Sequence, residues 1–290
     1  MTTPSGPEGL TAQVISSFGA TPDPRLRFLL ERMVHHLHAF AAETRLTEGE
    51  WATAVEFLTA VGQRCTPQRQ ELILLSDTLG LSMLVDLLNN GGAPSSTEST
   101  VLGPFYVPES PRRPMGSSII EQEGSGAPTR VSGTVRDVEN RPLEGALLDV
   151  WQNASNQLYA VEDPGQPPEN LRGRFSTGPD GRYWFWSARP TDYRIPVDGP
   201  VGRMMEASGR SAWRPAHLHV IVSAPGHRTV TTHFFDDESP HLDSDAVFGV
   251  KPSLLCHFEE HGPDEPGAPD GLTGAWYTME RDIVLTPTGS

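Results

Sequence analysis

Residues 213–222 read Trp-Arg-Pro-Ala-His-Leu-His-Val-Ile-Val, and this stretch predicts a β-strand with two histidines two positions apart. Successive side chains of a strand point to opposite faces of the sheet, so His217 and His219 share one face. Two imidazoles beside the cation of Arg214 fill a hydrophobic interior poorly, but they are suited to hold a metal such as zinc, copper or iron. The alternative is a pair of half-exposed strand histidines without a metal. The other face of the strand carries the apolar residues Leu218, Val220 and Val222.

The 290 residues are enough for one large domain or two ordinary ones, and a hydrophobic content of 37% can supply a core. The formal net charge of −15 argues against a nucleic-acid or anionic-membrane partner, because both are negatively charged. Only Cys65 and Cys256 are present, far apart in the chain, which favours a reducing compartment. We expect a cytoplasmic protein, because the sequence has neither the regions of a signal peptide nor a run of ~18 apolar residues.

The first hundred residues differ in kind from the rest, and residues 23–90 are typical of helices. Helix-end signals occur at Asp23-Pro24, at the capping box of Thr47 and Glu50, at Thr66-Pro67 and at Gly91-Gly92. Residues 72–85 are apolar nearly all round. Such a helix should be buried, either under a second domain or against a partner chain.

From about residue 129 onward the pattern becomes β-rich. Short runs that alternate or carry β-formers lie at residues 130–138, 146–152, 182–186, 217–223 and 229–235. Turn signals with glycine and proline separate them, which favours a sandwich or a barrel. Two long proline-rich connections, 163–168 and 190–200, are of the kind that carries function.

Tyrosine supplies the remaining candidate ligands. A phenolate is a hard, strongly donating oxygen, and together with two histidines it favours a trivalent Lewis-acidic metal, with Fe(III) as the natural candidate. Spacing alone does not select two of the five tyrosines. They are Tyr106, Tyr159, Tyr183, Tyr193 and Tyr277.

Four ordered motifs resemble the intradiol ring-cleaving dioxygenases, which include the catechol, chlorocatechol and hydroxyquinol 1,2-dioxygenases. They are residues 102–108 (LGPFYVP), residues 145–153 (GALLDVWQN), Tyr193 with residues 195–200 (IPVDGP), and residues 213–219 (WRPAHLH). The resemblance covers most of the chain. It implies an α+β fold with an N-terminal helical dimerisation domain, residues 1–100, and a C-terminal antiparallel β-sandwich catalytic domain, residues 101–290.

The resemblance also implies a non-haem Fe(III) held by Tyr159, Tyr193, His217 and His219. In the family pattern Tyr193 and His219 form the axial pair, while Tyr159 and His217 are equatorial beside a hydroxide. One departure concerns the first tyrosine: the family usually has Gly-Phe-Tyr or Gly-Leu-Tyr there, whereas this chain has Gln157-Leu158-Tyr159.

Within the family the chain is most similar to the hydroxyquinol (benzene-1,2,4-triol) branch. This similarity rests on residues 74–80 (LLSDTLG), 97–105 (TESTVLGPF), 199–204 (GPVGRM) and 242–251 (LDSDAVFGVK). His233 also stands where catechol dioxygenases usually have glutamine. The implied reaction cleaves hydroxyquinol with O2 to 3-hydroxy-cis,cis-muconate, the tautomer of maleylacetate. The alternative is cleavage of catechol or a chlorocatechol to a cis,cis-muconate.

The resemblance assigns Arg214 and Tyr193 catalytic roles: Arg214 would stabilise negative charge on the substrate, and Tyr193 would leave the metal and take up a proton. Asp77 is an acid on a nearly all-apolar helix, and a buried carboxylate needs a partner. We expect either a bond to a backbone amide or arginine, or a contact to the third hydroxyl of hydroxyquinol. The residues that match the pocket wall of the family are Leu74, Gly103, Pro104, Phe105, Ile195 and Pro196.

The family's N-terminal helices form the dimer contact, often with a phospholipid between the subunits, so we expect a homodimer. We interpret as surface or structural residues the histidines His35, His36, His38, His227, His233 and His241. Two interpretations that assign the chain to another functional class of protein stay open. One is a non-enzymatic β-sandwich that binds an aromatic ligand. The other is a colourless zinc hydrolase with His217, His219 and a further carboxylate or histidine ligand.

Overall fold

The computed structural model describes residues 6–66, 69–91 and 95–289, and the chain divides into two compact units. The first unit is Met1–Ala60 and the second is Val61–Ser290. This division falls earlier than the boundary at residue 100 that the sequence suggested. The second unit therefore contains helices as well as the whole β-rich region, and every residue of the candidate site lies in it.

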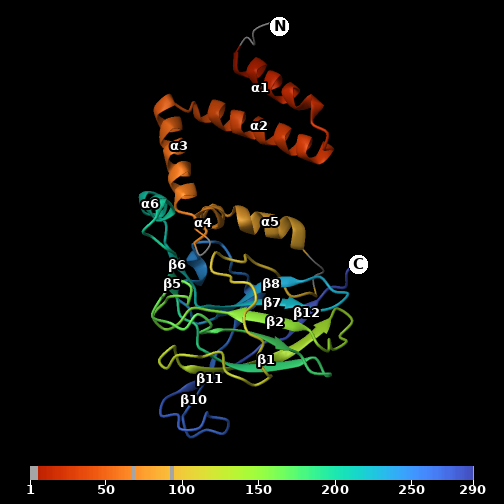
Figure 1. The fold of residues 1–290 in the computed structure, drawn as a ribbon, viewed down its shortest axis with the longest axis vertical. Helices are drawn as coiled ribbons and strands as arrows, with labels where there is room; N and C mark the ends of the chain where they lie inside the picture. The colour runs from red at the N-terminus through yellow and green to blue at the C-terminus, as the bar shows by residue number, and fades with distance from the viewer. Residues whose placement is uncertain (1–5, 67–68, 92–94, 290) are drawn as a thin grey trace. The chain divides into compact units, whose positions relative to one another are not determined.

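The first unit consists of helices (Figure 1). They are α1 (Gly6–Ser17), the 3-10 turn η1 (Phe18–Ala20), α2 (Pro24–Thr44) and most of α3 (Glu48–Gln63). The predicted helix starts at Asp23 and at Thr47 are confirmed. Asp23 accepts hydrogen bonds from the backbone N–H groups of Arg25 and Leu26. Thr47 and Glu50 form the reciprocal capping box before α3. Helix α1, which packs on α2, was not predicted.

The apolar segment at residues 72–85 forms two helices rather than one. Helix α4 (Glu71–Thr78) ends before Gly80, whose φ of 73° lies in the left-handed region, and α5 (Leu81–Asn90) follows. A left-handed residue cannot continue a right-handed helix, so glycine sets the break. The pair buries only one side, because Leu74 and Met83 are buried whereas apolar residues on the other side are exposed. Pro67 and Gly92 of the predicted helix-end signals lie outside the described residues.

Two five-stranded sheets form the body of the second unit (Figure 1). One has the order β10 (Glu259–His261), β11 (Trp276–Glu280), β1 (Pro128–Asp137), β12 (Ile283–Leu285), with β4 (Arg182–Ala188) also paired to β1. The other has the order β3 (Arg172–Ser176), β2 (Leu147–Trp151), β7 (His217–Ser223), β8 (Val230–Asp236), β9 (Leu255–Cys256). A small ribbon pairs β5 (Tyr193–Arg194) with β6 (Trp213–Arg214). Short helical pieces are α6 (Pro200–Ala207), η2 (Leu242–Ser244) and η3 (Pro252–Leu254).

The α+β class is confirmed, but the sheets are mixed rather than wholly antiparallel. Strand β1 runs parallel to both β11 and β12, and β8 runs parallel to β9. Parallel neighbours need a long connection, and most of the second unit separates β1 from β11 along the chain. Among the described residues, no helix combines the length and apolar character that a membrane crossing requires.

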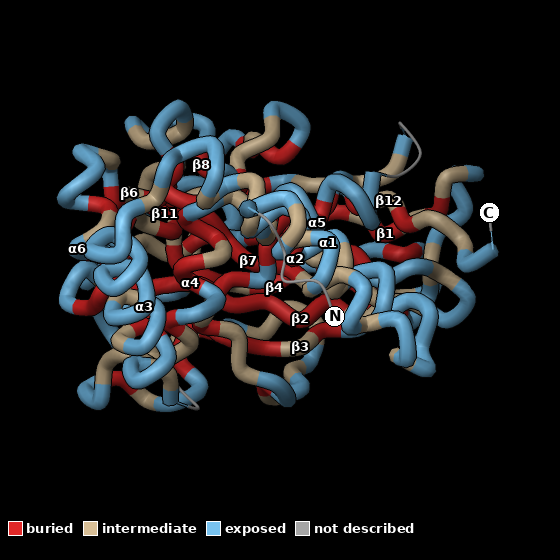
Figure 2. Tube along the Cα trace, turned by 90° about the horizontal axis from the view of Figure 1, so that it is seen from above, coloured by how far each residue is buried: buried red, intermediate tan, exposed pale blue. Residues whose placement is uncertain are grey.

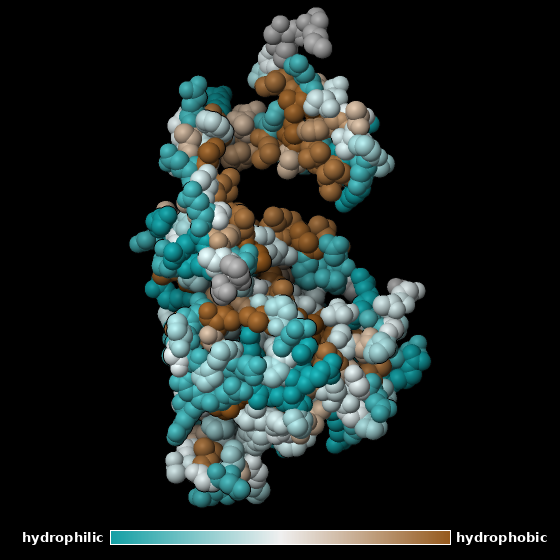
Figure 3. Space-filling model, in the orientation of Figure 1, coloured by the Kyte–Doolittle hydropathy of each residue, from teal (hydrophilic) through white to brown (hydrophobic). Residues whose placement is uncertain are grey.

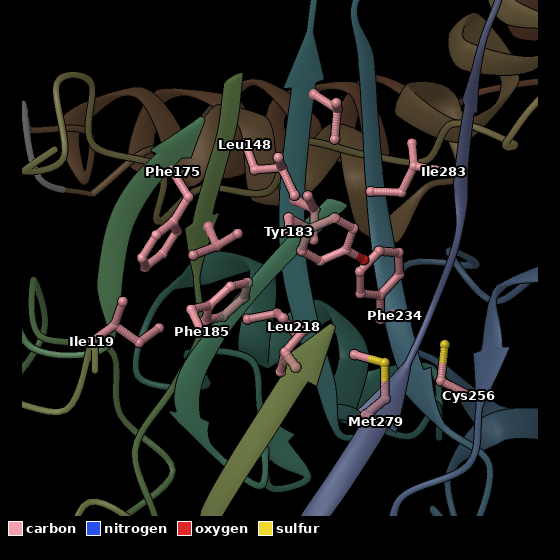
Figure 4. Packing of buried hydrophobic residues seen from close by; sticks show 14 of the residues in the cluster. Ile119, Leu148, Phe175, Tyr183, Phe185, Leu218, Phe234, Cys256, Met279 and Ile283 are labelled. Carbon is pink, nitrogen blue, oxygen red and sulfur yellow. The ribbon is translucent and has the colours of Figure 1, made fainter. Parts of the chain in front are cut away.

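Side chains from both sheets meet in one core (Figure 4). Leu148, Leu218 and Phe234 come from the β2–β7–β8 side, and Phe185 and Ile283 come from the other sheet. The central strands are the most buried part of the trace (Figure 2). The five predicted strand runs are found as β1, β2, β4, β7 and β8, with ends that differ by two residues at most.

Candidate metal centre and substrate pocket

Strand β7 sets the two histidines on the sheet face that points away from the core. Leu218 and Val220 belong to the core cluster, whereas Ile221 packs against a separate aromatic cluster on the histidine face. The predicted alternation of β7 is therefore confirmed. On the neighbouring strand β2, Trp151 is the register partner of His219. The two rings stack with centroids 4.6 Å apart and planes inclined by 13°, which limits the movement of the His219 imidazole.

Two other segments bring tyrosines to this face. Tyr193 lies on β5 directly opposite Arg214 on β6. Tyr159 lies in the loop between β2 and β3, and its hydroxyl is 3.0 Å from Nε2 of His219. The phenol rings of Tyr159 and Tyr193 meet edge to face at 5.4 Å. Two tyrosines and two histidines that are separated in the sequence thus converge in space.

The polar atoms of this group point toward one another. The Nε2 atoms of His217 and His219 lie 3.2 Å apart. A terminal nitrogen of Arg214 lies 3.2 Å from Nε2 of His217 and 3.3 Å from the Tyr193 hydroxyl, to which it donates. The exposed fractions are 2% for Tyr159, Tyr193 and Arg214 and 1% for His217 and His219.

Burial controls the protonation of these groups. It lowers the pKa of His217 and of His219 far below the usual value, and the cation of Arg214 acts in the same direction. Burial also raises the pKa of Tyr159 and of Tyr193, although the Arg214 cation opposes the rise for both phenols. The imidazoles are therefore neutral at pH 7 and offer lone pairs. The phenols become phenolates only where a strong positive charge is present.

The donor set fits a metal ion. Nδ1 of His217 lies 2.6 Å from the Pro215 carbonyl oxygen, so Nδ1 is the donor and the lone pair of the ring is on Nε2. That lone pair lies 3.2 Å from Nε2 of His219, so the nitrogens of the two rings lie close together in the site. Neutral imidazoles with phenol oxygens in a buried site form a hard, oxygen-rich donor set.

A pocket of about 550 Å³ is lined by residues that flank Tyr159 and Tyr193 in the sequence. Of the predicted wall residues, Phe105, Ile195 and Pro196 line it; Leu74, Gly103 and Pro104 are not among its lining residues, and neither is Asp77, the predicted contact to the third hydroxyl. Gly103 instead lies against His219: its φ is 77°, and a β-carbon at this position would lie 3.3 Å from Cε1 of that ring. Glu162, which sequence reasoning did not single out, also lines the pocket; burial raises its pKa to about 7.

Asp77 is 2% exposed, so its carboxyl group is buried as the sequence suggested. Burial raises its pKa, while a hydrogen bond with the Ser82 side chain and the charge of Arg214 oppose the rise. Arg214 does not pair with Asp77, however. Its partner is Asp245, whose Oδ1 accepts from Nε of Arg214 at 3.0 Å. Sequence reasoning did not assign Asp245 a role.

His233, interpreted from the sequence as a surface or structural residue, is fully buried. It lies on β8 directly opposite His219, because the two are register partners. The metal-binding atoms of His217, His219 and His233 all lie within 4.8 Å of one another. Among the described residues, neither ring nitrogen of His233 has a hydrogen-bond partner in good geometry. Only the strand register reveals this neighbourhood, and the register could not be read from the sequence.

Two family models match the chain in sequence order. The model described as "Catechol dioxygenase N terminus" matches residues 23–97, and the model described as "Dioxygenase" matches residues 101–284. The chain belongs to the intradiol dioxygenases. As a member of this family it is an enzyme of the ring-cleaving type, and the converging tyrosines and histidines lie within the region that the larger model covers.

The relatives of this dioxygenase span nearly its full length. Hydroxyquinol 1,2-dioxygenase of Rhizobium sp. (strain MTP-10005) is 46% identical over 94% of this chain and 92% of the relative. Hydroxyquinol 1,2-dioxygenase of Nocardioides simplex is 45% identical over 97% of this chain and 95% of the relative. The solved structure of hydroxyquinol 1,2-dioxygenase from Pseudomonas putida DLL-E4 has a TM-score of 0.88 and 44% identity, and covers 97% of this chain and 98% of that chain.

One departure of this dioxygenase from the family pattern has a structural consequence. Gln157, at the position two residues before Tyr159 where the resemblance led us to expect glycine, has a φ of 69°. This is the left-handed region, which costs an L-residue with a side chain about 1–2 kcal/mol. The loop before Tyr159 therefore keeps the backbone turn that glycine would favour, at some cost in stability.

Proposed function

We propose that this protein binds Fe(III) through Tyr159, Tyr193, His217 and His219 and cleaves the ring of hydroxyquinol with O2. The product would be 3-hydroxy-cis,cis-muconate, which takes up both oxygen atoms and tautomerises to maleylacetate. The observation that carries the proposal is the buried convergence of two phenols and two imidazoles in a chain 46% identical to a protein named hydroxyquinol 1,2-dioxygenase.

The donor types support a ferric ion. Phenolate oxygens favour a trivalent over a divalent metal, and the raised phenol pKa values require a strong positive charge before both tyrosines ionise. When bound, such an ion supplies Lewis acidity and a template for the two adjacent oxygens of a diol.

The residues of the chain then have separate tasks. The Tyr193 oxygen can hold or release a proton, and Arg214 already donates a hydrogen bond to that oxygen. Arg214 also stabilises negative charge on the ring oxygens in a site that is 2% exposed or less, where an oriented donor counts for more than in water. Phe105, Ile195 and Pro196 supply an apolar wall for the ring and exclude water from it.

Asp77 is proposed to contact the third hydroxyl of hydroxyquinol. Its buried carboxyl group lies within electrostatic range of Arg214, and its raised pKa favours a group that exchanges hydrogen bonds with a neutral hydroxyl. Catechol lacks this hydroxyl, so the contact would favour hydroxyquinol. Leu74 and Pro104 are proposed as further wall residues.

The test is a comparison of rates on hydroxyquinol, catechol and 4-chlorocatechol, followed by oxygen uptake and by identification of the products. We expect hydroxyquinol to have the highest kcat/KM and to consume one O2 per ring. A higher kcat/KM on catechol or 4-chlorocatechol would replace the proposed substrate with the alternative. An absence of cleavage on all three would remove the proposed activity.

A second candidate centre has one specific observation in its favour. His233 supplies the third histidine that a zinc site with His217 and His219 would need, and its nitrogens form no well-aligned hydrogen bond with the described part of the chain. The two centres respond differently to substitution. In the ferric centre Tyr159→Phe reduces metal content and His233→Gln does not; in the three-histidine centre the order is reversed, and the protein is colourless.

We also propose a homodimer formed through the helices. Exposed apolar side chains on α2 include Phe28, Leu29, Met33 and Phe40, and a separate exposed apolar group lies on α5 (Figure 3). Within the first unit, α1 and α2 line an open pocket of about 670 Å³ whose lining includes Leu10, Ile15 and several alanines, a suitable site for a phospholipid chain. Sedimentation that yields only monomer would contradict the dimer. The free cysteines Cys65 and Cys256 support a cytoplasmic location.

A further inference from the structure

Arg214 is held along one edge of its guanidinium group. Nε lies 3.0 Å from Oδ1 of Asp245, and one terminal nitrogen lies 3.5 Å from Oδ2 of the same carboxylate. The other terminal nitrogen is the one that faces Tyr193 and His217, at 3.3 and 3.2 Å. The side chains of the pair are 2% and 3% exposed. A single geometry therefore satisfies the carboxylate on one edge and directs the opposite edge into the site.

Asp245 is itself fixed by the loop in which it lies. Its carboxylate accepts the backbone N–H groups of Val247 at 3.3 Å and of Gly249 at 2.8 Å. A β-carbon on Gly249 would lie 3.2 Å from both the Arg214 terminal nitrogen and Oδ2 of Asp245. The N–H of Ala246 donates to the Trp213 carbonyl oxygen at 3.0 Å, which ties the loop to the strand that carries Arg214. The carboxylate is thus held by two backbone N–H groups of its own loop as well as by Arg214.

We propose that Asp245 is the positioning residue of the site, which holds one edge of the Arg214 guanidinium so that the other edge faces Tyr193 and the substrate. The inference rests on the proposed role of Arg214. Proline at 215 restricts the backbone of Arg214, but the long side chain keeps its own rotamer freedom, and a bidentate carboxylate removes it. Because Asp245 forms the ion pair with Arg214, the second buried acid, Asp77, is left available to a substrate hydroxyl.

Asp137 provides a matched control. Its buried carboxylate also accepts two backbone N–H groups, those of Glu139 at 2.9 Å and Arg141 at 3.0 Å, and also pairs with Nε of Arg141 at 2.7 Å. It lies at the end of β1, and none of these partners belongs to the candidate site. Asp137→Asn and Asp245→Asn therefore remove the same kind of loop-anchoring charge in two places.

The experiment compares the two variants in the iron-loaded protein. For Asp245→Asn we expect kcat on hydroxyquinol to fall at least tenfold, KM to change less than kcat, and the visible band of the protein to shift, because the hydrogen bond to Tyr193 is altered. We expect Asp137→Asn to lower the melting temperature without either change. The proposal is overturned if Asp245→Asn retains kcat within twofold of Asp137→Asn and leaves the visible band unchanged.

A second measurement is independent of activity. Urea unfolding gives the loss in free energy of unfolding for Arg214→Met, for Asp245→Asn and for the double variant. The two single losses should not add up in the double variant, because each single change leaves one buried charge alone. The double variant should be no less stable than the less stable of the two single variants. Additive losses would contradict the pairing. If the unsubstituted protein cleaves no diol, the proposed function fails, whereas this cycle still decides whether Asp245 holds Arg214.

Discussion

Gly103 lies against the imidazole of His219, so that a β-carbon at residue 103 would lie 3.3 Å from Cε1 of the ring. The glycine also has a φ of 77°, a conformation that other residues adopt at a cost of about 1–2 kcal/mol. One small residue thus permits both the turn after residue 102 and the close approach to a proposed metal ligand.

The first prediction follows from this contact. Gly103→Ala should destabilise the protein by about 1–2 kcal/mol through the backbone and, in addition, lower iron content or shift the visible band, because the His219 ring must move. Gly226→Ala is the control, since Gly226 has a φ of 74° and a β-carbon there would meet no described atom within 4 Å. Equal effects of the two variants on iron content and colour would show that the contact with His219 has no role.

The second prediction concerns substrate choice. Asp77→Ala should reduce kcat/KM on hydroxyquinol by about tenfold or more, the equivalent of ~1.4 kcal/mol, and affect catechol far less. Asp86→Asn removes another buried carboxylate on the neighbouring helix, where it pairs with Lys251, and should not change the ratio of the two rates. Equal losses on both substrates in Asp77→Ala would remove the proposed contact.

The third prediction uses the left-handed backbone of Gln157. Gln157→Gly should stabilise the protein by about 1 kcal/mol and raise Tm by about 2–4 °C, because glycine adopts a φ of 69° without a steric penalty. Gln157→Ala retains a β-carbon and should give little or no increase. Calorimetry of the three proteins checks this, and an equal Tm for Gln157→Gly and Gln157→Ala would contradict it.

The fourth prediction concerns the buried thiol. Burial raises the pKa of Cys256 to about 11, and its side chain is 5% exposed. At pH 8 only about one thiol in a thousand is then ionised, and the thiolate is the reactive form. In a Cys65→Ser background, iodoacetamide should leave the native protein unlabelled and label it fully in urea. Mass spectrometry measures both, and rapid labelling of the native variant would argue against the burial.

Much of the site follows from local sequence patterns. The alternation at residues 217–222 predicts which side chains leave the core, and Asp23 with Thr47 marks the helix starts. The break at Gly80 was missed, because the apolar pattern runs through it without interruption. Strand β3, with the sequence RGRFS, was also missed because its arginines hide the β-pattern.

Relationships across the fold could not be predicted in this way. The pairing of Arg214 with Asp245 joins residues 31 positions apart through a loop, and the approach of His233 to His219 depends on the β7–β8 register. The parallel pairing of β1 with β11 joins distant parts of the second unit. Each of these depends on tertiary packing, which the local pattern of a single chain does not specify. The metal ligands themselves stay a prediction.

The visible absorption spectrum of the purified protein, recorded before and after hydroxyquinol is added without oxygen, tests the central proposal most directly. Two tyrosinates on a ferric ion should give a burgundy protein with about one iron per chain, and the diol should shift the band as it displaces protein or solvent oxygens from the metal. A colourless protein that contains no iron and whose spectrum does not respond to hydroxyquinol would contradict the account.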